Sequence, residues 1–110
     1  IGAAKEKGAG YWAIGVDKCQ HAEGQVGEEN YVLACMMKRV DVGVHKATIE
    51  ALNGDFTGGV TELGLAEDGV GVCEAAEETA SAEALAKVEE FKTKIVAGEF
   101  VVPTNPKDVN

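Results

Sequence analysis

Two polar residues of opposite charge each follow an apolar stretch of this sequence. Asp17 comes directly after residues 11–16 (YWAIGV), and Lys38 follows residues 31–34 (YVLA), just ahead of a helical stretch. Neighbouring strands of a parallel sheet lie about 4.8 Å apart, so if these strands pair, both side chains can face one cleft at the carboxyl edge. An ionised carboxylate accepts two hydroxyl hydrogen bonds and an ammonium donates up to three. Together the two groups suit a vicinal diol.

The same spacing also has a simpler interpretation. Polar residues at strand ends usually cap turns, so an ion pair between Asp17 and Lys38, or a turn capped by Asp17, explains the pattern without a ligand. From the spacing alone, we favour this simpler interpretation over a binding site.

Other residue combinations give weaker predictions. Cys19 and His21 suggest a thiol nucleophile and its base, but neighbours in a loop rarely reach catalytic geometry, and no orienting third residue is obvious. A metal site built from Cys19, His21 and Cys35 lacks the fourth ligand and the paired spacing of structural zinc. The glycine-rich residues 64–71 (GLAEDGVG) lack the Lys-Ser/Thr of a phosphate-binding loop, which favours a turn or crossover. We therefore expect no catalytic residues, no metal and no cofactor.

The elements that must position Asp17 and Lys38 alternate along the chain. Apolar strands between helices of about 10 to 15 residues predict an α/β fold with a parallel sheet covered by helices. The last helix has the clearest signals, because Ser81 can cap it and Gly98 ends it ahead of Pro103. The predicted helices are residues 3–7, 39–52 and 82–97, and the predicted strands are residues 11–16, 31–34, 60–65 and 100–102.

Composition limits the possible classes of protein. The chain has 110 residues, 45% hydrophobic and 26% charged, which predicts one globular domain or part of one. A net charge of -9, with 10 basic residues among 19 acidic ones, argues against a nucleic-acid partner. No apolar run approaches the roughly 20 residues of a membrane-spanning helix.

Residues 1–7 (IGAAKEK) look like the last turns of a helix without its capping residue, so we expect a preceding part of the protein.

Three separated blocks of the sequence resemble, in order, the carboxyl-terminal part of one protein family. They are GYWAIGVDKCQ at residues 10–20, YVLACMMKRVDVGVHKATIEALNGDFTGGVTELGLAEDGVGV at residues 31–72 and KTKIVAGEFVVP at residues 92–103. The chain resembles the basic membrane lipoprotein family, whose PnrA-like members are purine-nucleoside-binding proteins of bacterial ABC importers. The specific marks are IGVD with a following Gln, a strand leading into KRVDV, and GDFTGG followed by LGLAEDGVG.

The resemblance implies a type I periplasmic-binding-protein fold, in which two α/β lobes joined by crossovers hold a nucleoside between them. Residues 1–110 would form the carboxyl-terminal portion of this two-lobed domain, including interlobe crossover segments. Asp17 matches the family's aspartate that binds the ribose hydroxyls, and Lys38 matches the lysine that joins it there. The implied protein is extracytoplasmic and non-enzymatic, is anchored by a lipid at a missing amino-terminal part, and delivers a purine nucleoside to an ABC permease.

Two departures from the family pattern limit what the resemblance implies. The family usually has a second aspartate where this chain has Cys19, and the residues that contact the purine lie largely before Ile1. The alternative interpretation is a ligand-sensing domain of the same fold in a receptor or transcription regulator. A lipobox cysteine upstream favours the importer component, whereas an upstream helix-turn-helix favours the sensor.

The three cysteines allow one pairing to be predicted. Cys19 and Cys35 each lie just past a predicted strand, and neighbouring strands would bring their Cα atoms within the roughly 4.4 to 6.8 Å of a disulfide. In an oxidising, extracytoplasmic setting we therefore expect a Cys19–Cys35 bridge, which leaves Cys73 free.

Overall fold

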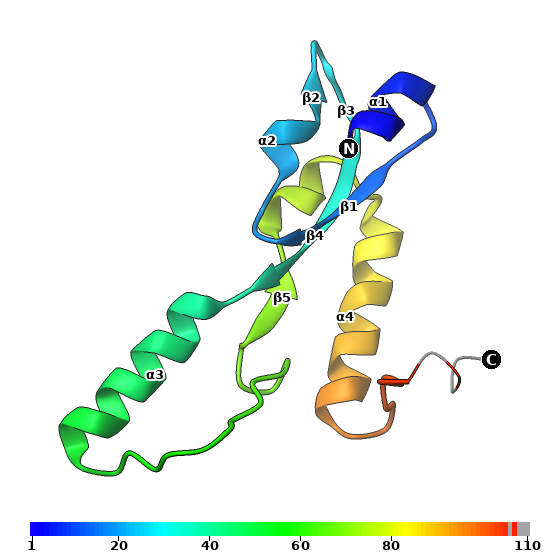
Figure 1. Cartoon of the computed structure of the whole chain (residues 1–110). Helices are drawn as coiled ribbons and strands as arrows, with labels where there is room; N and C mark the ends of the chain where they lie inside the picture. The colour runs from blue at the N-terminus through cyan, green and yellow to red at the C-terminus, as the bar shows by residue number, and fades with distance from the viewer. Residues whose placement is uncertain (106, 108–110) are drawn as a thin grey trace. The chain divides into compact units, whose positions relative to one another are not determined.

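The computed structural model describes residues 1–105 and 107, so the remaining residues of the predicted 1–110 domain lie outside the described part. The chain divides into two compact units, residues 1–80 and residues 81–110. The first unit contains the strands, and the second is built on one long helix (Figure 1).

A three-stranded sheet in the order β1–β4–β5 organises the first unit: β1 is Ala13–Asp17, β4 is Val32–Lys38 and β5 is Val70–Val72. β1 and β4 run parallel, whereas β5 runs antiparallel to β4, with Val70 opposite Lys38. The expectation of a parallel sheet is therefore wrong for β5, and the sheet is mixed. After β4 and the helix that follows it, β5 begins beside the carboxyl end of β4 and therefore runs back along it. A parallel strand would have to begin beside the amino end of β4, which requires a crossover connection.

The connection between β1 and β4 contains three short elements that the sequence did not predict. They are helix α2 (His21–Gly24) and an antiparallel hairpin of β2 (Gln25–Val26) and β3 (Glu29–Asn30). Elements of two to four residues show no hydrophobic period, and the turn signal is a single glycine, Gly27, with a positive φ of 61°.

The predicted helices are confirmed to within two residues at each end. They are α1 (Gly2–Lys7), α3 (Val40–Asn53) and α4 (Ala82–Val96), and a 3-10 helix, η1 (Glu74–Glu78), follows β5. Gly54 ends α3 in the left-handed conformation, with its N–H directed at the carbonyls of Glu50 and Ala51. Ser81 caps α4 by accepting a hydrogen bond from the N–H of Ala84 at 3.2 Å.

Two predicted strands are wrong, those at residues 60–65 and 100–102. Both segments lack strand structure, and Val60 is 97% exposed. Their alternating or apolar residues match the strand pattern, but a strand forms only where a partner offers its backbone hydrogen bonds. The third strand is instead β5, which begins at the end of the stretch of residues 64–71 predicted as a turn or crossover.

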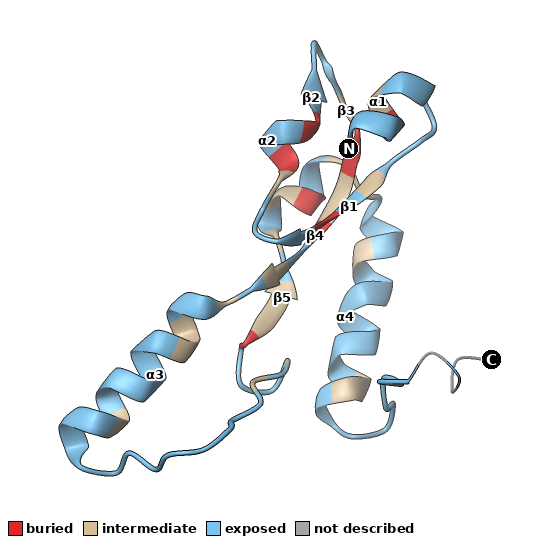
Figure 2. Ribbon diagram, in the orientation of Figure 1, coloured by how far each residue is buried: buried red, intermediate tan, exposed pale blue. Residues whose placement is uncertain are grey.

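The core of the first unit is small and surrounds β4. Val32 and Cys35 on β4 are almost completely buried, and Ala76 of η1 is 2% exposed. Figure 2 shows how few residues of the chain are buried. Nineteen large apolar side chains are exposed in the described residues, among them Ile14 and Val16 on β1. In the part of the chain that the structure describes, no helix has the length and apolar character needed to cross a membrane.

Candidate functional site

Asp17 and Lys38 lie together at the carboxyl edge of β1 and β4. The parallel register places Asp17 opposite Met37, one residue before the end of β4. The Nζ atom of Lys38 lies 3.2 Å from Oδ1 of Asp17, and the two side chains are 61% and 65% exposed. An exposed pair of this kind adds little to stability, so both groups keep hydrogen-bonding capacity for another partner.

The structure therefore brings these two predicted residues together, as the sequence spacing suggested. It also shows the ion pair of the simpler interpretation, and whether the pair binds a sugar stays a prediction. One detail differs: β4 runs on to Lys38 rather than ending at residue 34, so Lys38 is the last residue of the strand.

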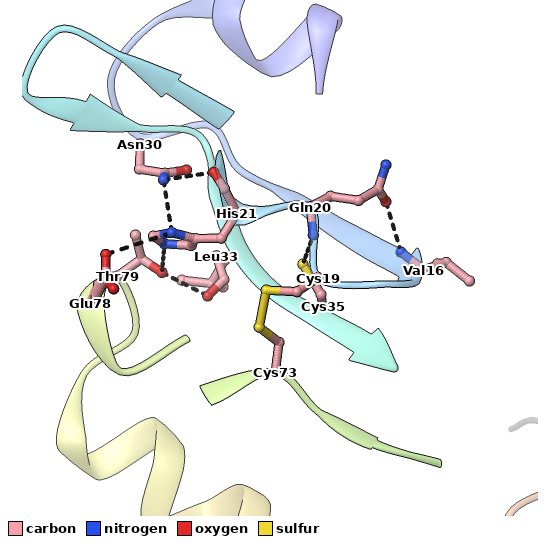
Figure 3. The surroundings of a disulfide bond; sticks show 10 residues. All are labelled: Val16, Cys19, Gln20, His21, Asn30, Leu33, Cys35, Cys73, Glu78 and Thr79. Atoms are coloured by element: carbon pink, nitrogen blue, oxygen red, sulfur yellow. Dashed lines mark hydrogen bonds and ion pairs between the residues drawn. A yellow bond between two sulfur atoms is a disulfide. The ribbon is translucent and has the colours of Figure 1, made fainter. Parts of the chain in front are cut away.

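The predicted disulfide is wrong. Cys19 is bonded to Cys73, with their Cα atoms 5.6 Å apart, and Cys35 is a free, buried thiol (Figure 3). Cys35 lies inside β4 and is paired with Gly15, so it is not past a strand end. The antiparallel β5 then carries Cys73 alongside β4, where its N–H donates to the Cys35 carbonyl at 3.0 Å. The correct pairing thus depends on a strand that the sequence did not predict.

His21, considered in the sequence as a base or a metal ligand, instead joins segments that are distant in the chain, and no sequence pattern predicted these contacts. Its Nδ1 lies 3.2 Å from Nδ2 of Asn30, and its Nε2 lies 3.4 Å from Oγ1 of Thr79 (Figure 3). A neutral imidazole protonated at Nε2 satisfies both contacts, because Thr79 can accept this proton while its hydroxyl donates to the carbonyl of Leu33 at 2.9 Å. Glu78 lies 3.6 Å from Nδ1 and would pair with a protonated ring. These contacts give His21 a structural role, because they connect α2 to the β2–β3 hairpin and to the end of η1.

Two charged pairs flank the Asp17–Lys38 edge. Beyond Asp17, the hydrogen bond from Lys18, followed by that from Gln20, lowers the pKa of Glu23 below its usual value. The same Glu23 hydrogen bond raises the pKa of Lys18. These groups are thus already partnered.

After Lys38, the guanidinium of Arg39 makes paired hydrogen bonds to Asp41 in the first turn of α3, at 3.0 and 2.8 Å. This interaction lowers the pKa of the Asp41 carboxyl and raises the pKa of Arg39. Arg39 is thereby engaged at the start of the helix, although it directly follows Lys38 in the sequence.

Among the described residues, no group of three or more His, Cys, Asp or Glu side chains is placed to hold a metal ion. Cys19, one of the three residues weighed for metal binding, is consumed by the disulfide. A depression of about 260 Å³ lies over β4 and β5, below the roughly 300 to 1,000 Å³ of typical ligand pockets. It is lined by Met37, Arg39, Gly71, Val72, Cys73 and Glu74.

An α/β sheet with polar side chains at its carboxyl edge is typical of proteins that bind small ligands. The family model of the Bmp proteins, described as ABC transporter substrate-binding protein PnrA-like, matches residues 1–106. The chain belongs to this family of ABC transporter substrate-binding proteins, and the family resemblance found in the sequence is confirmed.

Individual relatives agree with this assignment. The chain is 43% identical over 108 residues to the CD4+ T-cell-stimulating antigen of Listeria monocytogenes serovar 1/2a, covering 93% of this chain and 30% of the relative. It is 31% identical to Basic membrane protein B of Borreliella afzelii, covering 96% of this chain and 28% of the relative. A crystal structure of ABC transporter system solute-binding proteins from Aeropyrum pernix K1 is similar over 97% of this chain, with a TM-score of 0.65 and 27% identity.

The chain spans about 30% of the length of the curated relatives that it matches and 37% of the solved one. The α/β fold class predicted from the sequence is confirmed by this structural relative, with the corrected sheet direction.

Proposed function

We propose that this chain is the carboxyl-terminal portion of an extracytoplasmic solute-binding protein that captures a nucleoside, preferably a purine nucleoside, for an ABC transporter. The family membership supports the transport class. The observation that carries the ligand class is the exposed Asp17–Lys38 pair, 3.2 Å apart at the carboxyl edge of two parallel strands.

In this proposal the Asp17–Lys38 pair binds the ribose of the nucleoside. The Asp17 carboxylate accepts hydrogen bonds from the 2′ and 3′ hydroxyls, and the Lys38 ammonium donates to one of the same oxygens. The ion pair keeps both groups at the edge before the ligand arrives. Residues 1–110 then supply about half of a site between two lobes, and the base-contacting residues and a lipid anchor belong to a preceding part of the protein. The role is binding and delivery to a permease rather than catalysis.

The test is calorimetry on the full-length protein that carries this chain. Asp17→Asn is the suitable variant, because asparagine keeps the size and tolerates the left-handed backbone of this residue while it removes the charge. We expect about tenfold weaker binding of inosine or guanosine, since hydrogen bonds to a charged group are roughly twice as strong as neutral ones. Hypoxanthine, which lacks the ribose, should bind poorly to the parent and be little affected by the variant.

Asp55→Asn is the matched control, because this exposed carboxylate lies just after α3, and its residue contributes only a backbone N–H to the carbonyl of Glu50. It should leave inosine affinity unchanged. If Asp17→Asn binds inosine as tightly as the parent and melts at the same temperature, Asp17 is a turn residue and not a ligand contact. An upstream helix-turn-helix in place of a lipobox cysteine would favour the sensor over the importer component.

A further inference from the structure

Asp17 has a backbone conformation that residues other than glycine seldom adopt. Its φ is 74°, in the left-handed region, and the one other described non-glycine residue with a positive φ is Asp68. Such a conformation persists only where the surrounding structure holds it in place. The residues that hold Asp17 therefore decide where its carboxylate points.

Gln20 closes the backbone around Asp17. Its Oε1 accepts a hydrogen bond from the N–H of Val16, the residue before Asp17, at 3.1 Å (Figure 3). Its own N–H donates to Sγ of Cys35 at 3.2 Å, which fastens the end of the loop to β4. The segment from Val16 to Gln20 is thus tied to itself and to the neighbouring strand.

The disulfide attaches the same loop a second time. Cys19 lies between Asp17 and Gln20 and is bonded to Cys73, 54 residues later in the chain. Cys73 is itself held on β4, because its N–H donates to the carbonyl of Cys35. Cys35 therefore receives both attachments, one through its thiol and one through its carbonyl.

The packing beneath this loop is close. A Cβ atom added to Gly15 would lie 2.7 Å from Sγ of Cys35 and 3.0 Å from Oε1 of Gln20. Real Cβ atoms essentially never come as close as the 2.7 Å to Cys35, and the 3.0 Å to Gln20 is tighter than nine in ten real Cβ contacts. The absence of a side chain at Gly15 therefore leaves room for both side chains beside β1.

We propose that Gln20 and the Cys19–Cys73 disulfide are positioning elements that hold the Asp17 carboxylate in the orientation that binds ribose hydroxyls. This inference rests on the proposed function. A loop fixed before the ligand arrives avoids the entropy cost of ordering Asp17 on binding, so losing either attachment raises the dissociation constant.

The experiment compares inosine with 2′,3′-dideoxyinosine, which lacks both hydroxyls, in calorimetry on the full-length protein. Gln20→Leu removes the side-chain bonds to Val16 and to Glu23. Loss of the bond to Val16 should weaken inosine binding about three- to tenfold, the range of one hydrogen bond. The affinity for dideoxyinosine should not change, because Asp17 has no hydroxyl to contact in that ligand. A merely structural defect would weaken both ligands alike. Gln25→Leu is the matched control, since Gln25 bonds only within its hairpin, to Gly27 and Asn30.

The disulfide is tested by Cys19→Ser/Cys73→Ser and by mild reduction of the parent. Both should weaken inosine about three- to tenfold and spare dideoxyinosine, and the double variant should not respond to reduction. If the double variant fails to fold, the inosine affinity of the reduced parent protein tests the role of the disulfide. Inosine affinity within twofold of the parent in all cases, or equal losses for both ligands, overturns the positioning role while the proposed function stands. A parent protein that binds no nucleoside overturns the proposed function and this inference together.

Discussion

Asp17 combines an exposed carboxylate with a left-handed backbone. The carboxylate favours ligand binding, whereas the backbone conformation lowers the stability of the fold. The carboxylate is available to a ligand, with its side chain 65% exposed. The backbone conformation costs free energy that glycine would avoid, although aspartate tolerates it better than most residues. A residue kept in a costly conformation at a strand edge fits a role in ligand contact better than a role in stability.

The left-handed backbone of Asp17 predicts how substitutions of this residue change the stability of the protein. Asp17→Gly should change the free energy of unfolding by less than about 1 kcal/mol, because relief of strain is offset by a more flexible unfolded chain. Asp17→Val should be less stable than Asp17→Gly by about 1 to 2 kcal/mol, because a β-branched residue cannot readily reach a φ of 74°. Denaturant unfolding of the full-length protein measures the difference. At Asp55, which has no positive φ, valine should not be less stable than glycine, and equal stability of the two Asp17 variants would contradict the argument.

The long helices were predictable because their signals are local. In α4 a serine cap, one apolar face and a glycine stop all lie within one stretch of sequence, and α3 ends at the Asn53–Gly54 pair. The edge formed by Asp17 and Lys38 was predictable for a related reason, since parallel strands that end in polar residues place them side by side.

The elements that the sequence did not reveal depend on long-range partners. β5 has three residues, and its central Gly71 breaks any apolar alternation. Its direction follows from the path of the chain after α3, which no local pattern reports. The missed strand explains the wrong sheet direction, and together with the predicted end of β4 at residue 34 it explains the wrong disulfide. Gln20 was visible as part of the family pattern, but its hydrogen bond back to Val16 was not.

The N-terminal cap of α4 can be tested directly. In a synthetic peptide covering the helix and its flanks, Ser81→Ala should lower helix stability by about 1 kcal/mol, because the N–H of Ala84 loses its acceptor. Helices of this length are marginal alone, so the loss should appear as reduced helicity in circular dichroism. Ser81→Asp keeps an acceptor and should retain the helicity. Equal helicity of Ser81→Ala and the parent peptide would show that the cap contributes nothing.

For the protein as a whole, the important feature of residues 1–80 is a set of exposed apolar side chains on one face of the sheet. The register places Val16 opposite Met36 and Met36 opposite Val72, and Ile14 lies two residues before Val16 on the same face. All four side chains are exposed, whereas the buried core around β4 is small. Contiguous apolar surface of this kind is usually an interface. Since the relatives are about three times as long as this chain, we expect the rest of the protein to cover this face.

The isolated chain should therefore be only marginally stable. Uncovered apolar surface forfeits about 25 cal/mol for each Å² that the rest of the protein would bury. The disulfide is then a main source of stability, because closing a loop of this length is worth about 4 kcal/mol in the chain-entropy model. We expect residues 1–110 alone to bind a hydrophobic dye, to melt over a broad range and to lose their remaining structure on reduction. The full-length protein should melt sharply and bind little dye. A sharp two-state transition of the monomeric chain that persists after reduction would show that these residues form a complete folding unit.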